Sequence, residues 1–126
     1  MKIVARSGAH EINIFLNDSR TAQQIYNSLP LDSKISVWGE EIYFRIPARI
    51  PPENPTVNIR IKDVCYWPQG ACVCIFFGPT PMSPAQDPVP ASAVTLIGRA
   101  ECSVDELRDF REGDKIVLNR QDKILS

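Results

Sequence analysis

Apolar and polar residues alternate along much of this chain. Between positions 11 and 16, Ile12, Ile14 and Leu16 are two residues apart and so share one face of an extended backbone. This period of two is typical of strands with one buried face. The pattern predicts about eight strands, at Glu11–Leu16, Lys34–Trp38, Glu41–Pro47, Val57–Lys62, Cys65–Trp67, Ala71–Phe77, Val94–Glu101 and Lys115–Asn119.

Two of these strands carry more specific expectations. On the strand that follows the Gly-Glu turn, Ile42, Phe44 and Ile46 are expected to face inward. That orientation leaves Tyr43 and Arg45 on the outside. The run from position 71 to 77 is apolar at every position, which indicates a central strand covered on both faces.

Two segments have the spacing of amphipathic helices. The first spans Arg20–Leu29, with Asp18 or Ser19 as its N-cap, and its apolar residues form one stripe. The second begins at a capping box in which Ser103 and Glu106 satisfy the first free backbone amides. Strands in this number with only two helices favour a closed antiparallel barrel, because closure removes sheet edges and the helices cover the open ends.

The segment Gly78–Pro90 has a different composition. Five of its thirteen residues are proline, at positions 79, 81, 84, 88 and 90. Proline has no amide donor, so this segment is not expected to form a central strand. We predict a stiff surface loop, and loops of this length in compact domains are usually functional or disordered.

Composition limits the classes of protein to consider. The chain has 126 residues, 44% of them hydrophobic and 23% charged, which predicts one globular domain spanning residues 1–126. With 14 Lys and Arg against 15 Asp and Glu, the net charge is -1, so we expect no nucleic-acid partner. The longest apolar run is far shorter than the roughly 20 residues of a membrane helix, so we expect no membrane partner. The N-terminus has no signal-peptide core, so we expect a cytoplasmic protein.

The four cysteines do not form a recognisable ligand set. Cys72 and Cys74 share one strand face, but no Cys-x-x-Cys pair occurs and the only histidine, His10, is distant in sequence. We therefore expect these thiols to pack as small hydrophobic groups, with no metal and no cofactor.

Read in order, the elements resemble the cyclophilin fold. Residues 20–25, RTAQQI, look like the family's Lys-Thr-Ala-x-x-Phe helix start, and residues 41–47, EIYFRIP, look like its Phe-His-Arg-Ile-Ile-Pro strand. Residues 75–77, IFF, resemble its Gln-Phe-Phe strand, and residues 94–99 its Val-Val-Phe-Gly-Lys-Val strand. A closer resemblance is to small bacterial and archaeal cyclophilin-like proteins of unassigned function, through Trp38–Phe44, Tyr66–Gly70 and Phe76–Pro81.

This resemblance implies a groove for a proline ring on the outer face of the barrel. It identifies Arg45 with the family's catalytic arginine, which stabilises the transition state of X-Pro rotation. Phe77 matches the groove phenylalanine, Ile75 stands where the family has glutamine, and the proline loop adds Thr80 and Met82. These four are the candidate ligand-binding residues.

The catalytic motif is incomplete. FRIP is one residue shorter than HRIIP, residues 48–55 replace a glycine-rich segment, and residues 79–93 contain neither the tryptophan nor the histidine of active members. We therefore expect binding of a peptide or small molecule without efficient isomerase activity. Two alternatives stay open: a weak peptidyl-prolyl isomerase that uses Arg45, and a partner subunit of an enzyme that processes small-molecule amides.

Overall fold

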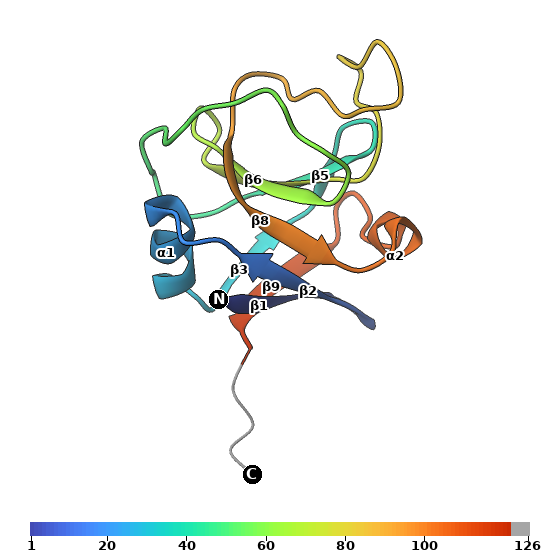
Figure 1. Ribbon diagram of the computed structural model, residues 1–126. Coiled ribbons are helices and arrows are strands. Elements are labelled where there is room, and N and C mark those ends of the chain that lie inside the picture. The colour runs from blue at the N-terminus through green and yellow to red at the C-terminus, as the bar shows by residue number, and fades with distance from the viewer. Residues whose placement is uncertain (122–126) are drawn as a thin grey trace.

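The computed structural model describes residues 1–121, which form nine strands and two short helices (Figure 1). The strands are β1 (Lys2–Ser7), β2 (His10–Leu16), β3 (Leu31–Lys34), β4 (Ser36–Val37), β5 (Glu41–Arg45), β6 (Asp63–Trp67), β7 (Cys72–Phe76), β8 (Thr95–Glu101) and β9 (Lys115–Arg120). The helices are α1 (Arg20–Asn27) and α2 (Val104–Arg108).

One antiparallel sheet contains all nine strands, in the order β3-β9-β1-β2-β8-β6-β7-β5-β4. The two end strands, β3 and β4, are consecutive in the chain and are separated only by Ile35. The Ser33 hydroxyl on β3 donates to the backbone carbonyl of Arg45 on β5 at 2.6 Å, across the junction. The sheet thus forms a nearly closed barrel, as the sequence predicts.

The strand positions differ from the prediction in three places. β1 and β3 are additional strands, because the inward positions of β1 include the small Ala5 and Ser7, and β3 contains a single apolar residue. The prediction of a strand at Val57–Lys62 is wrong. Val57 is 55% exposed, and only Ile59 of the alternating residues is buried, against the outside of the barrel. Lys62 has a positive φ of 78°, which belongs to a turn.

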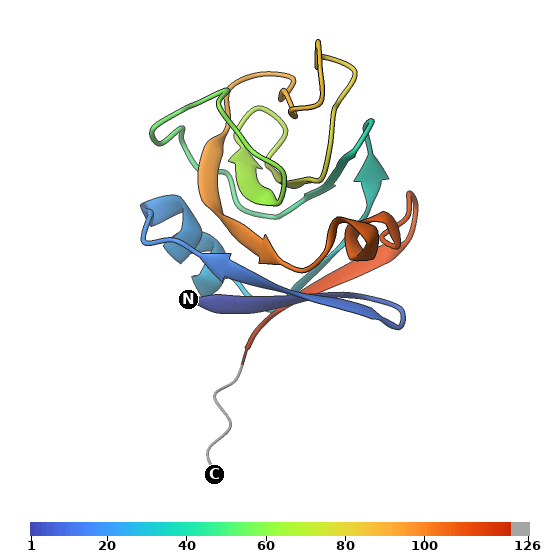
Figure 2. The ribbon, with the colours of Figure 1, turned by 45° about the vertical axis from the view of Figure 1, so that its right-hand side comes forward.

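Both helices form where the capping residues predict them. Ser19 caps α1 by accepting from the amide of Ala22, and Ser103 caps α2 by accepting from the amide of Glu106. α1 ends two residues earlier than expected, at Asn27. The helices lie at opposite ends of the barrel (Figures 1 and 2).

The barrel strands bury apolar side chains on two sides. Inward residues such as Ile14, Phe44, Ile75 and Leu118 form the main core. A second cluster lies on the outer face of β5, β6 and β7, and consists of Ile59, Cys65, Cys72, Cys74, Phe76 and Val94, with Tyr43 and Trp67 packed against it. Hence β7 is buried at every position, as the sequence predicts.

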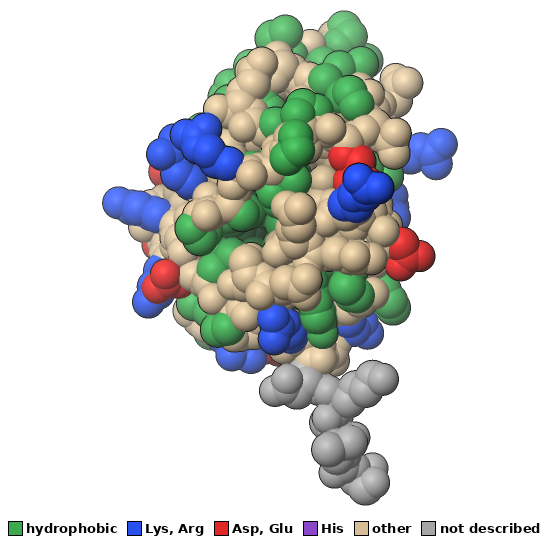
Figure 3. Space-filling model, turned by 90° about the vertical axis from the view of Figure 1, so that its left-hand side faces the viewer, with side chains coloured by type: hydrophobic (Ala, Val, Ile, Leu, Met, Phe, Trp, Pro, Cys, Tyr) green, Lys and Arg blue, Asp and Glu red, His purple; other side chains and the backbone are tan. Residues whose placement is uncertain are grey.

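Two long connections cover this second cluster. Residues 46–62 and 77–94 lie on the same side of the molecule, above β5 and β6 (Figure 2). On the face at the α1 end, Lys and Arg side chains are scattered around an apolar middle and do not gather into one patch (Figure 3). None of the helices within residues 1–121 is long and apolar enough to span a membrane.

Candidate functional site

The residues expected to form a groove with Arg45 do not share its face of the sheet. Arg45 is exposed on the outer face of β5, as the alternation predicts. Ile75 is buried on the inner face of β7, where it pairs with Ile42 of β5. Phe77 is also buried in the inner core. The structure therefore separates Arg45 from Ile75 and Phe77 by the thickness of the sheet.

The two loop candidates have different environments. The buried Thr80 hydroxyl donates to the carbonyl of Val89 and accepts from the amide of Met82, and the Thr80 amide donates to the Ser83 hydroxyl. These bonds fold residues 80–89 back on themselves. Met82 is 55% exposed. Thr80 thus organises the loop, and the Met82 side chain projects into solvent.

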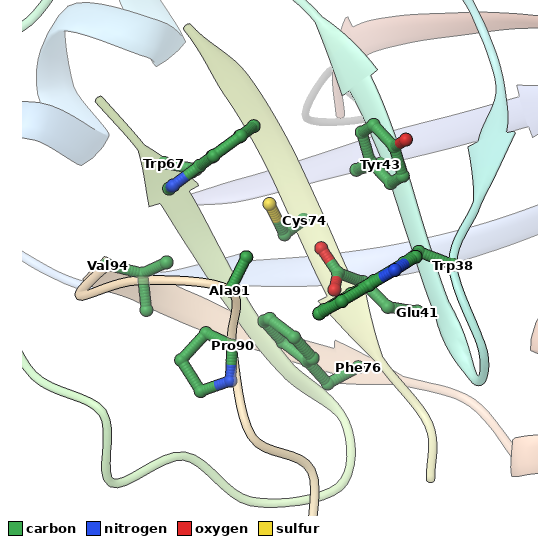
Figure 4. Close-up of a pocket in the computed structure, with 9 residues that line it drawn as sticks. All are labelled: Trp38, Glu41, Tyr43, Trp67, Cys74, Phe76, Pro90, Ala91 and Val94. Carbon is green, nitrogen blue, oxygen red and sulfur yellow. The ribbon is translucent and has the colours of Figure 1, made fainter. Parts of the chain in front are cut away.

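The outer face holds a different arrangement, an aromatic pocket of about 280 Å³ (Figure 4). Its floor comes from β5 and β7, and its side comes from the chain that enters β8. The lining residues are Trp38, Glu41, Tyr43, Trp67, Cys74, Phe76, Pro90, Ala91 and Val94. We call this the aromatic pocket below.

Strand register explains why these side chains meet. Trp38 and Glu41 exchange two backbone hydrogen bonds across the turn, at 2.9 and 3.2 Å, so they are directly opposite and on one face. Glu41 is in turn opposite Phe76 on β7. Two residues further along the same face, Tyr43 is opposite Cys74. The pocket floor is therefore two adjacent rows of cross-strand neighbours.

The connection between β7 and β8 forms the remaining wall. Pro90, Ala91 and Val94 lie across the pocket from Trp38 and Glu41 (Figure 4). The indole N–H of Trp67 donates to the Ser92 hydroxyl at 2.7 Å and so attaches this connection to β6. Closure of the pocket thus depends on a segment about fifty residues away in sequence from the turn that carries Trp38.

Glu41 is the unusual residue of the pocket. The residue is 6% exposed, and its Oε1 has no hydrogen-bond partner within the described part of the chain. Burial raises the pKa of the Glu41 carboxyl from 4.5 to about 7, and contact with the Cys74 thiol offsets part of this rise. None of the Lys and Arg residues in positions 1–121 forms an ion pair with it. The pocket therefore contains a carboxyl group whose charge is uncompensated.

The neighbouring thiols remain protonated near neutral pH. Burial raises the pKa of Cys65 and of Cys74 far above 9.0, and the nearby Glu41 carboxylate raises both further. All four cysteines are free, and three are buried, as expected for thiols that pack as small apolar groups. Within residues 1–121 no three His, Cys, Asp or Glu side chains are grouped so that they could hold a metal ion.

Sequence reasoning identifies this pocket only in part. Trp38, Tyr66 and Trp67 stand out in the sequence as aromatics that could line a groove. The two tryptophans line the pocket, whereas Tyr66 is buried in the main core. Glu41 and Phe76 do not stand out in this way. Phe76 is on a strand that is apolar throughout, so its side chain is predicted to be in the core. Glu41 is beside a turn, so its carboxylate is predicted to be exposed to water.

One sequence signal could have revealed the pocket. The outward residues of β5, at positions 41, 43 and 45, lie beside the outward residues of β7, at positions 72, 74 and 76, which are all apolar. An apolar outer sheet face needs to be shielded from water, and a proline-rich segment follows β7 directly in the chain. This combination predicts that the segment folds over the outer face.

Comparison with known proteins agrees with this architecture. Residues 1–119 match a family model described as Cyclophilin-like. The solution structure of the hypothetical protein AF2241 from Archaeoglobus fulgidus is similar, with 33% sequence identity and a TM-score of 0.82. That match covers 96% of this chain and 95% of the archaeal chain. None of the curated proteins matches the chain.

Proposed function

Since the chain belongs to the cyclophilin-like family, we propose that it is a binding domain that holds a small molecule or a peptide side chain in the aromatic pocket, without efficient isomerase activity. The observation that carries this proposal is a cavity of about 280 Å³ with four aromatic rings and one buried carboxyl group. Ligand sites are commonly apolar concavities of about 300–1,000 Å³ with a few polar groups. The pocket volume is just below the lower end of this range, which suits a small group.

The positions of the candidate catalytic residues support the absence of isomerase activity. The resemblance to cyclophilins implies catalysis in which an apolar groove holds the proline ring while an arginine stabilises the transition state at the prolyl nitrogen. Here Ile75 and Phe77 contact the inner core, whereas Arg45 is on the outer face and does not line the aromatic pocket. A proline ring held beside Arg45 would lack those two apolar contacts.

An exchange assay on an Ala-Ala-Pro-Phe peptide tests this part of the proposal. We expect the cis–trans exchange rate, measured by NMR exchange spectroscopy, to be the same with and without stoichiometric protein. Arg45→Ala is expected to leave that rate unchanged. Acceleration by the wild-type protein that is lost in Arg45→Ala would overturn the proposal in favour of a residual isomerase.

Tryptophan fluorescence tests ligand binding at the pocket itself. The chain has two tryptophans, Trp38 and Trp67, and both line the pocket, so the emission reports on this site. Titration with small apolar probes such as benzyl alcohol is expected to give a saturable change in emission.

A pair of loop variants supplies the control. Ala91 lines the pocket and Ala93 does not, although both are exposed on the same connection. We expect Ala91→Phe to fill the cavity and abolish the saturable change, and Ala93→Phe to retain it. An equal response in both variants would show that the probe binds elsewhere and would contradict the proposed site.

A further inference from the structure

We propose that the aromatic pocket recognises an alkylated ammonium cation, carried by a small molecule or by a methylated lysine side chain, which it holds between its aromatic rings and the carboxylate of Glu41. This inference rests on the proposed function, since it assigns a ligand class to the same pocket. Four features of the pocket support it, and each is independent of the resemblance to other proteins.

The first feature is the density of aromatic rings. Trp38, Tyr43, Trp67 and Phe76 supply four of the nine lining residues and come from four different segments of the chain. Aromatic rings attract cations through their negative faces, most strongly for tryptophan and when the site is desolvated. A pocket that needed only apolar contact would be served equally well by aliphatic residues.

The second feature is the carboxyl group within this aromatic surface. A buried charge is costly unless it is paired, so buried carboxylates normally have a cationic partner or hydrogen bonds. Glu41 has an unpartnered oxygen and is directed into the cavity among Trp38, Cys74 and Phe76 (Figure 4). A ligand cation would supply the charge that the described part of the protein does not provide.

The third feature is the scarcity of hydrogen-bond acceptors. A primary ammonium group has three N–H donors, each of which needs an acceptor once it leaves water. Besides Glu41, the polar groups among the lining side chains are the Tyr43 hydroxyl, the Cys74 thiol and the indole N–H groups. The Trp67 N–H is already bonded to Ser92. A cation whose N–H groups are replaced by methyl groups avoids this deficit and fills the pocket with apolar surface.

The fourth feature is the electrostatic environment of Glu41. The titratable or charged groups that face it are Tyr43 and Arg45 from its own strand, Cys72 and Cys74 from the adjacent strand β7, and Cys65 from β6, the next strand in the sheet. The thiols have raised pKa values and remain neutral below pH 8, so they neither attract nor repel a cation. Arg45 is exposed and does not line the pocket, so the selectivity for a cation comes from Glu41 and the rings.

A pair of isosteric probes tests the inference. Choline carries a trimethylammonium group, and 3,3-dimethylbutan-1-ol has the same shape with a neutral carbon in place of nitrogen. We expect choline to change the tryptophan emission of the full chain with a dissociation constant at least tenfold lower than that of the alcohol at pH 8. A short peptide with trimethyllysine, compared with its unmethylated form, distinguishes a side-chain source from a free small molecule.

The pH dependence assigns the effect to Glu41. With a pKa of about 7, this carboxyl is about one-tenth ionised at pH 6 and about nine-tenths ionised at pH 8. Choline affinity is therefore expected to rise about tenfold over this interval, and the affinity of the neutral alcohol is expected to stay constant. The Glu41→Gln variant is expected to lose both the preference for choline and its pH dependence.

Matched variants separate recognition from folding. Glu40→Gln removes a carboxylate from the adjacent residue, which pairs with Arg108 and does not line the pocket, and should leave choline binding unchanged. Tyr43→Leu, which removes a ring of the pocket, should weaken choline binding several-fold, and more than Tyr43→Phe, which keeps the ring. Equal binding of choline and the alcohol would overturn the cation inference and leave the proposed pocket intact. No response to choline, the alcohol or benzyl alcohol would overturn both.

Discussion

At the scale of single residues, the local sequence and the three-dimensional environment conflict most strongly at Glu41. A glutamate beside a Gly-Glu turn would ordinarily be hydrated, yet here it lies under Trp38 and beside Phe76. Its backbone position is fixed by the hairpin, so the side chain cannot leave the face that the proline-containing connection covers. Desolvation of this carboxyl should lower the stability of the free protein at neutral pH.

The stability of Glu41→Gln relative to wild type should therefore depend on pH. The folded-state pKa of about 7 is above the unfolded value of about 4.5, so between these values the folded state binds the extra proton and wild-type stability falls as pH rises. The cost is absent below about pH 4.5 and complete above about pH 7.

The variant cannot titrate at this site. Between pH 4 and pH 8, its free energy of unfolding should gain about 3 kcal/mol relative to wild type. Urea denaturation of both proteins across this range measures the difference. A difference that is constant with pH would mean that Glu41 keeps an ordinary pKa in the folded protein.

At the scale of elements, the β4–β5 turn and the β7–β8 connection depend on each other. The Glu40 amide donates to the carbonyl of Pro79 at 3.0 Å, and the Phe77 amide donates to the carbonyl of Glu40 at 2.9 Å. Gly39 has a positive φ of 59°, and a Cβ there would lie 2.8 Å from the Pro81 side chain and 2.9 Å from the Cα of Thr80. The turn can approach the connection this closely because residue 39 has no side chain.

Substituting this glycine should displace the connection that walls the aromatic pocket. We expect Gly39→Ala to lower the free energy of unfolding by about 2 kcal/mol, because alanine disfavours the positive φ and its Cβ clashes with the backbone of the connection. We also expect the variant to bind ligands more weakly. Thermal denaturation and the tryptophan titration measure the two effects.

Gly8→Ala is a matched control, because Gly8 has the same φ of 59° and open space where its Cβ would be. Gly8→Ala should lower the free energy of unfolding by only about 1 kcal/mol and leave ligand binding unchanged. Equal effects of the two substitutions on stability and binding would show that the contact between turn and connection has no energetic role.

At the scale of the whole molecule, the barrel closes through Ile35. This residue separates β3, which pairs with β9, from β4, which pairs with β5, so one short stretch of chain belongs to both edges of the sheet. The Ile35 amide donates to the carbonyl of Asp114, and its own carbonyl accepts from the amide of Gly113. Its side chain is fully buried in the main core.

Truncating this side chain tests how much stability depends on closure. Ile35→Ala should lower the free energy of unfolding by about 3 kcal/mol, the central range for a buried isoleucine, because the cavity forms where two sheet edges meet. Guanidinium denaturation measures this cost. Ile61→Ala, at an exposed position, should change stability by less than about 0.5 kcal/mol. A similar small effect at Ile35 would argue that closure contributes little.

The amino-acid sequence by itself determined those features that depend on local interactions. Period-two patterning places Ile42 and Phe44 inside and Tyr43 and Arg45 outside, because successive side chains of a strand point in opposite directions. The serines at positions 19 and 103 start the helices, because a hydroxyl oxygen satisfies amides that the helix leaves free. These local interactions, together with strand number, are sufficient to predict a barrel.

Only the tertiary structure decided which face of β7 lines the aromatic pocket. The sequence indicates core for Phe76 and, through the resemblance, a groove for Phe77, yet Phe76 lines the aromatic pocket and Phe77 is in the barrel core. Likewise, the alternation of Val57, Ile59 and Ile61 indicates a strand that the chain does not form. The physical reason is that burial on an outer sheet face depends on whether another segment covers it. That cover comes from residues 90–94, which lie across the pocket from Trp38 and Glu41 (Figure 4) although they are about fifty residues away in sequence.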